Sequence, residues 1–300
     1  MGTHDLEETI PFRIITFNIR YANPKPIPGE ALWSTRCPKL ATQLRFLAAG
    51  HPATFICLQE ALANQVTDIK AELGGSWKYI GVGRDDGVAA GEFSPVFYDA
   101  NVWTCERSKT YWLSQTPERA GSRGWDAVLP RIVTMGQFQY QQTRARVVVL
   151  STHFDHRGIK AREESASLIL RLTDAWVGSS SDVETSRHRK PPVFLGGDFN
   201  STPSDKAYLT MTAAGTGMTD ISTLLPKERR YGNELTYSSF GENDEVPKRI
   251  DFLFVKDTSG IKFLTFGVLA NRFDDGIFLS DHRATVADIE IPVKGQSSFH

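Results

Sequence analysis

Short apolar runs, some alternating with polar residues and some continuous, recur along the whole chain. Alternation with a period of two is typical of half-buried β-strands, and a continuous apolar run suits a strand covered on both faces. We predict strands at residues 12–19, 54–59, 94–98, 131–140, 144–154, 192–199, 249–255 and 284–291.

Three segments show the 3.6-residue period of amphipathic helices instead: 39–50, 61–73 and 158–176. Gly74 and Gly178 follow the second and third of them, as glycines often do at helix ends. Strands and helices therefore alternate unevenly, which favours two sheets sandwiched between helices in one α+β domain.

The polar stretch GSSSDVETSRHRKPP predicts a flexible surface loop at 178–191. A strand pattern resumes directly after it, so the stretch does not mark a domain boundary. We predict an N-terminal tail at 1–11 and a single domain at 12–300.

The balance of charged residues limits the kinds of molecule that the protein is expected to bind. The chain has 34 Lys and Arg residues and 35 Asp and Glu residues, for a net charge of −1. This balance argues against a protein that holds long nucleic acid by neutralising many phosphates, although a local basic groove stays possible. The three cysteines have neither disulfide-framework nor zinc-type spacing.

The N-terminus lacks the apolar core of a secretory signal, and no run approaches the length of a membrane span. We therefore expect an intracellular, cytoplasmic protein without membrane insertion. We also expect a monomer.

Residues that commonly bind metals or phosphate follow several of the apolar runs. Any one of them has an ordinary explanation, such as a turn-capping Asn or a first-turn Glu at a helix dipole. Their repeated position, where strands give way to loops, indicates a shared site. The residues are Asn18, Glu60, His153, Asp198, Asn200, Asp251, Asp281 and His282.

Metal-assisted hydrolysis of a phosphoester would use this set. Mg²⁺ prefers a few protein oxygen ligands together with water and phosphate oxygens. We predict Glu60 as a direct ligand of Mg²⁺ or Mn²⁺, with Asn18 and Asp281 beside it, directly or through water.

The remaining residues suit the other parts of the reaction. Asp198 is the candidate for aligning and deprotonating the attacking water, and Asn200 for donating a hydrogen bond to phosphate. His153 and His282 would stabilise developing charge. We expect the glycines at 196 and 197 to let the chain turn tightly before Asp198.

Six motifs in this order resemble the exonuclease-endonuclease-phosphatase superfamily. They are TFNIR (16–20), LQE (58–60), STHFDH (151–156), GGDFNSTPSD (196–205), RIDFLFV (249–255) and SDHRA (280–284). The resemblance implies a four-layered α/β/β/α sandwich of two mixed sheets flanked by helices, with the active site at one end. It implies the same metal and catalytic roles for the residues above.

The resemblance adds two pairings. It implies that Asp251 is the partner of His282, and that Glu92, within GEFSPVFY (91–98), is the partner of His153. The segments YWLSQTPE (111–118) and GSRGWDAVLPRIVT (121–134) make the chain most similar to an uncharacterised branch of the superfamily.

Charged and aromatic residues flank the motifs and are predicted to contact substrate: Arg36, Trp125, Arg131, Asp155 and Arg157. Arginine with tryptophan beside a phosphate site favours a small phosphorylated molecule with a ring, such as a nucleotide, sugar phosphate or inositol phosphate. Three alternatives remain: a nuclease acting on DNA or RNA, a catalytically inactive phosphate-binding module, and a lipid phosphodiesterase. The last needs an exposed apolar hairpin, for which DDGIFLS (274–280) is too short.

Overall fold

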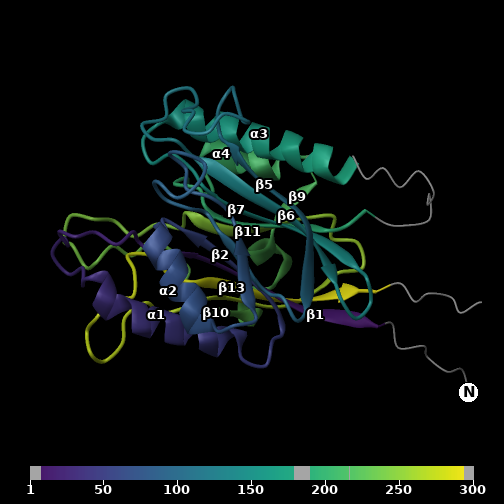
Figure 1. The fold of residues 1–300 in the computed structure, drawn as a ribbon, viewed down its shortest axis with the longest axis horizontal. Coiled ribbons are helices and arrows are strands. Elements are labelled where there is room, and N and C mark those ends of the chain that lie inside the picture. Colours follow the sequence, from purple (N-terminus) through teal and green to yellow (C-terminus); the bar gives the residue numbers. More distant parts are fainter. Residues whose placement is uncertain (1–7, 179–189, 216, 294–300) are drawn as a thin grey trace, which may run out of the picture.

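A computed structural model describes residues 8–178, 190–215 and 217–293. Within these ranges two mixed β-sheets pack face to face, and helices cover both outer faces (Figure 1). The predicted α+β fold, a four-layered α/β/β/α sandwich, is confirmed. No helix among the described residues is long and apolar enough to cross a membrane.

The first sheet places β1 near its centre, parallel to β2 and antiparallel to β13. Its strands, in spatial order, are β10 (Arg230–Gly232), β12 (Lys262–Val268), β13 (Thr285–Pro292), β1 (Thr9–Asn18), β2 (Ala53–Gln59), β4 (Val96–Asp99) and β3 (Trp77–Ile80). The second sheet has β7 and β8 side by side and parallel. Its strands are β5 (Trp103–Trp112), β6 (Ile132–Tyr140), β7 (Arg146–His153), β8 (Val193–Asp198), β11 (Asp251–Lys256) and β9 (Met218–Asp220).

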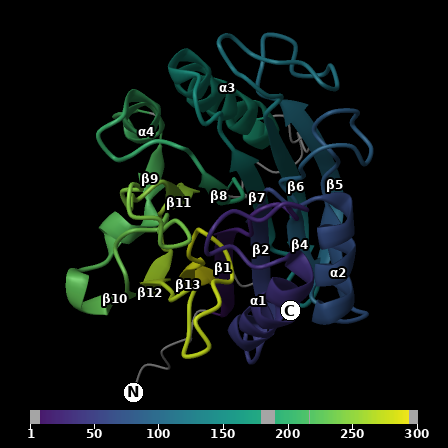
Figure 2. The same ribbon diagram turned by 90° about the vertical axis from the view of Figure 1, so that its left-hand side faces the viewer.

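Two pairs of helices form the outer layers, as Figure 2 shows. Helices α1 (Trp33–Ala48) and α2 (Ala63–Leu73) pack on the first sheet, and α3 (Ile159–Gly178) and α4 (Lys206–Thr212) pack on the second. Two short 3₁₀ helices, η1 (Ile221–Leu224) and η2 (Lys227–Arg229), follow β9.

The period-two pattern of β1 explains the layering. Ile14 faces the core between the sheets, whereas the next residue, Ile15, faces the layer of α1 and α2. Between the sheets the rings of Phe12 and Phe194 stack with centroids 4.4 Å apart. The two sheets are thus fixed against each other by tightly packed aromatic side chains.

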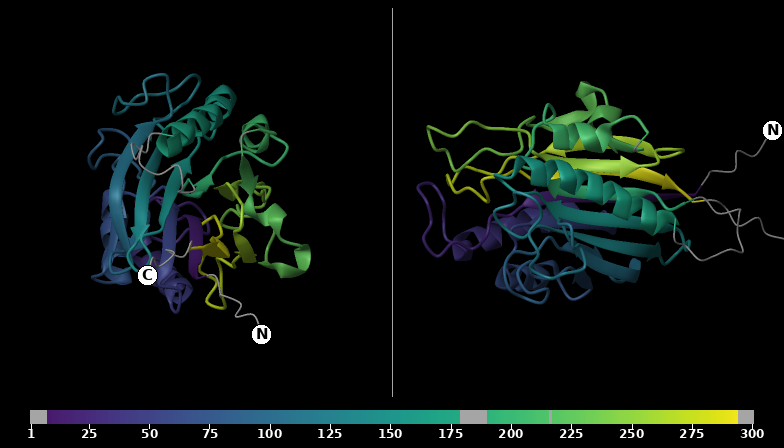
Figure 3. Two further views of the ribbon diagram at one scale, coloured as in Figure 1. Left: turned by 90° about the vertical axis from the view of Figure 1, so that its right-hand side faces the viewer. Right: turned by 90° about the horizontal axis from the view of Figure 1, so that it is seen from above.

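The strand register brings polar residues together at one end of the sandwich. The β7–β8 pairing sets His153 opposite Asp198, and the β8–β11 pairing sets Asp198 opposite Asp251. In the first sheet, Asn18 pairs with Gln59, the residue before Glu60. Seen from above in Figure 3, the start of β1 at Thr9 and the end of β13 at Pro292, which pair with each other, lie toward the other end of the molecule.

The glycines before Asp198 serve packing rather than a turn, so that prediction was wrong. Both lie within β8, and the left-handed backbone is at Asn200, with φ of 44°. A Cβ on Gly196 would lie 3.0 Å from the Cβ atoms of Cys57 and Thr16 in the facing sheet. The missing side chain therefore lets β8 approach the first sheet closely.

Element boundaries differ from the predictions at several points. Strand β1 begins at Thr9, inside the predicted tail at 1–11, and α1 begins at Trp33 with Pro38 inside it. Strands β3, β5, β9, β10 and β12 and helix α4 were not predicted at all. The predicted loop at 178–191 falls mostly on residues 179–189, which lie outside the described residues.

Candidate active site

The side chain of Asn18 links the two sheets at the centre of the site. Its amide nitrogen donates to Glu60 Oε1 at 2.9 Å and to Asp198 Oδ2 at 3.0 Å. Ser280 Oγ donates to the main-chain oxygen of Asn18 at 2.7 Å, which fixes the end of β1. Residues predicted from distant parts of the sequence therefore converge on one buried amide.

Glu60 and Asp281 form an acidic pair on the side of the first sheet. Burial favours the neutral form of Glu60, but Arg20 and Asn18 outweigh it and hold the pKa of this carboxyl below its usual value. Burial, together with the charge of Glu60, raises the pKa of Asp281. Glu60 has a backbone φ of 60°, and its second oxygen accepts from the amide of Tyr21 at 3.2 Å.

Arg20 is a charged neighbour of this pair that was not among the predicted site residues. The acids Glu60, Asp281 and Glu30 raise its pKa above the ordinary value even though burial opposes this. Its Nε lies 3.3 Å from Glu30 Oε1. Arg20 ends the motif TFNIR, and its position in that motif was the available signal.

Asp198 and Asn200 are held together by a local turn. The amide of Asn200 donates to Asp198 Oδ1 at 2.8 Å, and its side-chain nitrogen donates to the Phe154 oxygen at 3.1 Å. Burial, and then the nearby charge of Asp251, raises the pKa of Asp198 to about 7. A carboxyl group with this pKa can exchange a proton with water near neutral pH.

His282 is the charged imidazole of the site. Its Nδ1 donates to Asp251 Oδ2 at 2.9 Å, and its Nε2 lies 3.7 Å from Asp198 Oδ2. Burial would lower the pKa of His282, but these two carboxylates raise it well above its ordinary value. Thr236 Oγ1 accepts from the amide of Asp251 at 3.0 Å and so fixes the partner of His282.

His153 is the neutral imidazole. Burial, and then the charges of Arg131 and Arg84, lowers its pKa well below the ordinary value. The Asn200 amide lies 3.0 Å from Nε2 and donates to it, so the proton of the neutral ring belongs on Nδ1. The site therefore contains two histidines in different protonation states.

Glu92 faces His153 but is bound more closely by arginine. Its Oε2 lies 3.7 Å from His153 Nδ1, whereas Arg84 Nη1 donates to the same oxygen at 2.5 Å. Arg131 Nη1 lies 3.9 Å away. Burial and the charge of Glu60 raise the pKa of Glu92 to about 7, against the two arginines. Arg84 was not predicted, because it lies in a glycine-rich loop without a distinctive pattern.

The residues predicted to contact substrate differ in where they lie and in how exposed they are. Arg131 lies beside Glu92, and its Nη2 is 3.1 Å from His156 Nδ1. Asp155 is buried, and its carboxylate accepts backbone N–H groups, including that of Gly158 at 2.7 Å, so it organises the loop. Trp125 is half-buried against the core beneath α3, and Arg157 is exposed.

The structure contradicts the prediction that Arg36 contacts substrate. It is fully buried, and its guanidinium donates only to main-chain oxygens, including those of Ile19 at 2.8 Å and Leu279 at 2.9 Å. These oxygens belong to the segments that carry Arg20 and Asp281. Arg36 therefore holds the main chain of these segments in place, because the five N–H donors of one guanidinium can satisfy several buried carbonyl groups.

Two sets of oxygen and nitrogen atoms could hold a cation. Asp198, Asp251 and His282 each offer a ligand atom within 4.8 Å of the others. In that set the hydrogen bond between Asp251 and His282 already occupies an atom of each residue. Glu60 and Asp281 offer carboxylate oxygens, which is the chemistry that Mg²⁺ prefers. Asn18 turns its amide nitrogen toward Glu60, and its oxygen accepts from the Arg20 amide at 3.0 Å, so it orients Glu60 from beside this pair.

Comparison with known proteins agrees with this geometry. Residues 15–282 match the model of the endonuclease/exonuclease/phosphatase family. An endonuclease/exonuclease/phosphatase from Bacteroides vulgatus is 34% identical, with 93% of this chain and 98% of that chain covered and a TM-score of 0.80. No curated protein matches the chain.

Two structures from Bacteroides thetaiotaomicron are similarly close. One, an endonuclease/exonuclease/phosphatase family protein, is 28% identical over 98% of this chain and 100% of that chain, with a TM-score of 0.82. The other, a mannosyl-6-phosphatase, is 29% identical over 93% and 99%, with a TM-score of 0.78. Together with the family match over most of its length, these likenesses show that the chain belongs to the endonuclease/exonuclease/phosphatase family, whose members hydrolyse phosphoester bonds.

Proposed function

We propose that the protein is a phosphoesterase dependent on a divalent metal, Mg²⁺ or Mn²⁺, that hydrolyses a small phosphorylated molecule. The observation that carries the proposal is the pair of hydrogen bonds from Asn18 to Glu60 and Asp198. One amide thus fixes the distance between the carboxylate suited to a metal and the carboxylate suited to a water molecule.

Glu60, with Asn18 and Asp281 beside it, would hold the metal. The lowered pKa of Glu60 keeps its carboxylate anionic. Burial, and after it the charge of Glu60, raises the pKa of Asp281, and a bound cation would favour the ionised form of this carboxyl. When bound, the metal would supply positive charge against the phosphate oxygens.

Asp198 would orient the attacking water and accept its proton. Its pKa of about 7 suits a general base at neutral pH, and Asn18 and the Asn200 amide hold its two oxygens in place. The water would then attack phosphorus in line with the leaving oxygen.

The imidazoles and the Asn200 amide would contact the phosphate. Protonated His282, oriented by Asp251, is suited to donate a hydrogen bond to an oxygen on which negative charge develops. Asn200, whose side-chain nitrogen lies 3.0 Å from His153 Nε2, would exchange this hydrogen bond for one to another phosphate oxygen, with His153 beside it. Arg131 and Arg84 add positive charge on this side.

We propose a sugar, nucleotide or inositol phosphate as the class of substrate. The near-zero net charge and the 29% identity to a mannosyl-6-phosphatase support a small substrate. The test is release of inorganic phosphate from a panel of these compounds, with Mg²⁺, with EDTA, and with the Asp198→Asn variant as a blank.

Each outcome of this panel has a meaning. Metal-dependent phosphate release that the variant lacks supports the proposal. Cleavage of oligonucleotides without hydrolysis of any small compound would replace it with nuclease activity, and saturable phosphate binding without turnover of either class would indicate an inactive binding module.

A further inference from the structure

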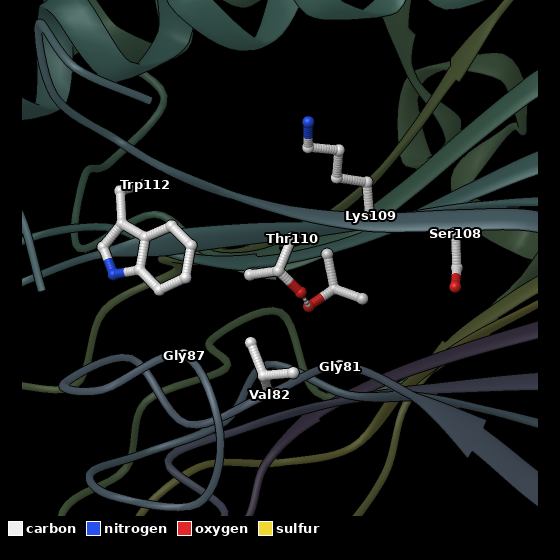
Figure 4. Close-up of a pocket in the computed structure, with 8 residues that line it drawn as sticks. Gly81, Val82, Gly87, Ser108, Lys109, Thr110 and Trp112 are labelled. Carbon is white, nitrogen blue, oxygen red and sulfur yellow. Dashed lines mark hydrogen bonds between the residues drawn. The ribbon is translucent and has the colours of Figure 1, made fainter. Parts of the chain in front are cut away.

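A second cavity, of about 280 Å³, lies between β5, β6 and the loop that contains Gly81 and Gly87. Figure 4 shows side chains of β5 that point toward this loop. None of the residues assigned above to metal, water or phosphate lines it. The cavity is slightly smaller than the roughly 300–1,000 Å³ of typical small-molecule sites, so its size suits a single ring.

Hydroxyl groups line one wall of the cavity. Ser108 and Thr110 lie on the same face of β5, and Thr134 comes from the neighbouring strand β6. The oxygens of Thr110 and Thr134 are 3.3 Å apart, so they share one hydrogen bond. A hydroxyl group has one donor and two acceptor positions, and this pair therefore keeps capacity for a ligand.

The cavity carries no net charge at its surface. Of the described residues that line it, none is acidic, and its one basic residue is Lys109. The Lys109 ammonium extends to the opposite side of β5 in Figure 4 and pairs with Glu118. A charged ligand would find no opposite charge here, and a divalent cation would find no carboxylate.

Carbon atoms complete the lining. The Trp112 indole nitrogen donates to the Arg84 main-chain oxygen at 2.6 Å, so the tryptophan offers the cavity only its carbon edge. Val82 adds an aliphatic side chain from the loop. Apolar carbon atoms next to hydroxyl groups match a molecule that itself carries both C–H and O–H groups.

We propose that this cavity is a second, non-catalytic binding site for one neutral hydroxyl-rich ring, a sugar or cyclitol unit. It is separate from the phosphate site but shares a wall with it. Ile132 lines the narrow gap beside His153, and Thr134 lines the cavity, two residues along the same strand. Two residues of strand span about 7 Å. The main-chain oxygen of Arg84 accepts from Trp112, which lines the cavity, while the Arg84 side chain binds Glu92 beside the phosphate site.

Equilibrium binding tests the proposal without any need for catalysis. Saturation-transfer NMR titrations would use methyl α-mannopyranoside, methyl α-glucopyranoside and myo-inositol as probes. Ser108→Trp fills the cavity from an exposed position, and Thr104→Trp is the matched control, because Thr104 is an exposed position on the opposite face of β5. Inorganic phosphate serves as competitor for the catalytic site.

We expect at least one probe to bind saturably to the wild type and to Thr104→Trp, with at least tenfold weaker binding to Ser108→Trp and no displacement by phosphate. Absence of saturable binding by all three probes would overturn the proposal. So would equal binding to Ser108→Trp, or displacement by phosphate, which would place the ring in the catalytic site. If Ser108→Trp fails to fold, the Thr110→Val variant takes its place. We expect it to bind the probe at least fivefold more weakly than the wild type. Unchanged binding to this variant would contradict the proposed site.

Discussion

Asn18 Nδ2 lies 3.0 Å from Asp198 Oδ2, although the two residues are 180 positions apart and belong to different sheets. This contact couples the two halves of the sandwich at the end that carries the candidate site. In the proposed mechanism, the amide of Asn18 would position both the metal-binding Glu60 and the water-activating Asp198.

Asn18→Ala should reduce kcat/KM about 10- to 100-fold, the usual cost of losing a group that orients metal ligands. The fold should persist, because a methyl group fits where the amide was. Steady-state kinetics with Asn101→Ala, an exposed position, as control would measure this. Activity equal to that of the control variant would show that the bridging amide does not matter.

Asp198→Asn should lower kcat about 10²- to 10⁴-fold, the contribution typical of a general base. The amide oxygen can still accept from Asn200, so thermal unfolding should change little. Single-turnover rates beside Asp244→Asn, an exposed acid-to-amide control, would test this. Turnover within threefold of wild type would move the base elsewhere.

Glu60→Gln should raise the Mg²⁺ concentration for half-maximal activity at least tenfold, a loss of about 1.4 kcal/mol or more in metal binding. The substitution removes the anionic ligand but keeps the size of the side chain. The matched control is Glu72→Gln, an exposed surface acid. An identical metal titration for both variants would point to the Asp198, Asp251 and His282 set instead.

The pH dependence should report His282. Its pKa is raised in the folded protein, so its stabilising charge is fully present below the unfolded value of about 6.5 and is lost as the pH rises through the folded value. Activity and stability should therefore fall on the alkaline side. Asp251→Asn should move that alkaline limb to lower pH, measured as kcat/KM and as urea stability across the range. A limb that stays in place would mean that another group titrates.

Arg36→Lys should destabilise the protein by about 3 kcal/mol, because lysine cannot donate to the same set of buried carbonyls. Urea unfolding would measure the loss. KM of the folded enzyme should change little. A raised KM with unchanged stability would restore the original prediction that Arg36 contacts substrate.

The fold and the centre of the site could be predicted because their signals are local. Buried strands such as β7 and β8 are apolar along their length, and Asp198 follows directly after one of them. Strand β12 escaped prediction because four of its seven residues are not buried, which leaves little periodic signal. The same holds for β5 at the sheet edge, where charged residues face solvent.

Other features depend on contacts that no local pattern encodes. Helix α1 continues through Pro38, because Trp33 and Cys37 pack into the core and Arg36 binds the neighbouring loops. The close approach of Arg84 to Glu92 depends on a loop whose shape is set by distant residues such as Trp112. Gly196 of β8 was also misinterpreted, because the contacts that require a glycine there come from the opposite sheet.

The crosswise row of His153, Asp198 and Asp251 on three adjacent strands has a consequence for how such a protein can diverge. Backbone ladders hold the reactive groups, whereas the loop of Arg84 and the segment before Arg131 only border them. Under the proposed function, the groups for chemistry and the loops that would contact substrate are thus separable parts of the chain. A lineage can exchange its loops for those of a relative and acquire a new preference while the reacting groups stay in register.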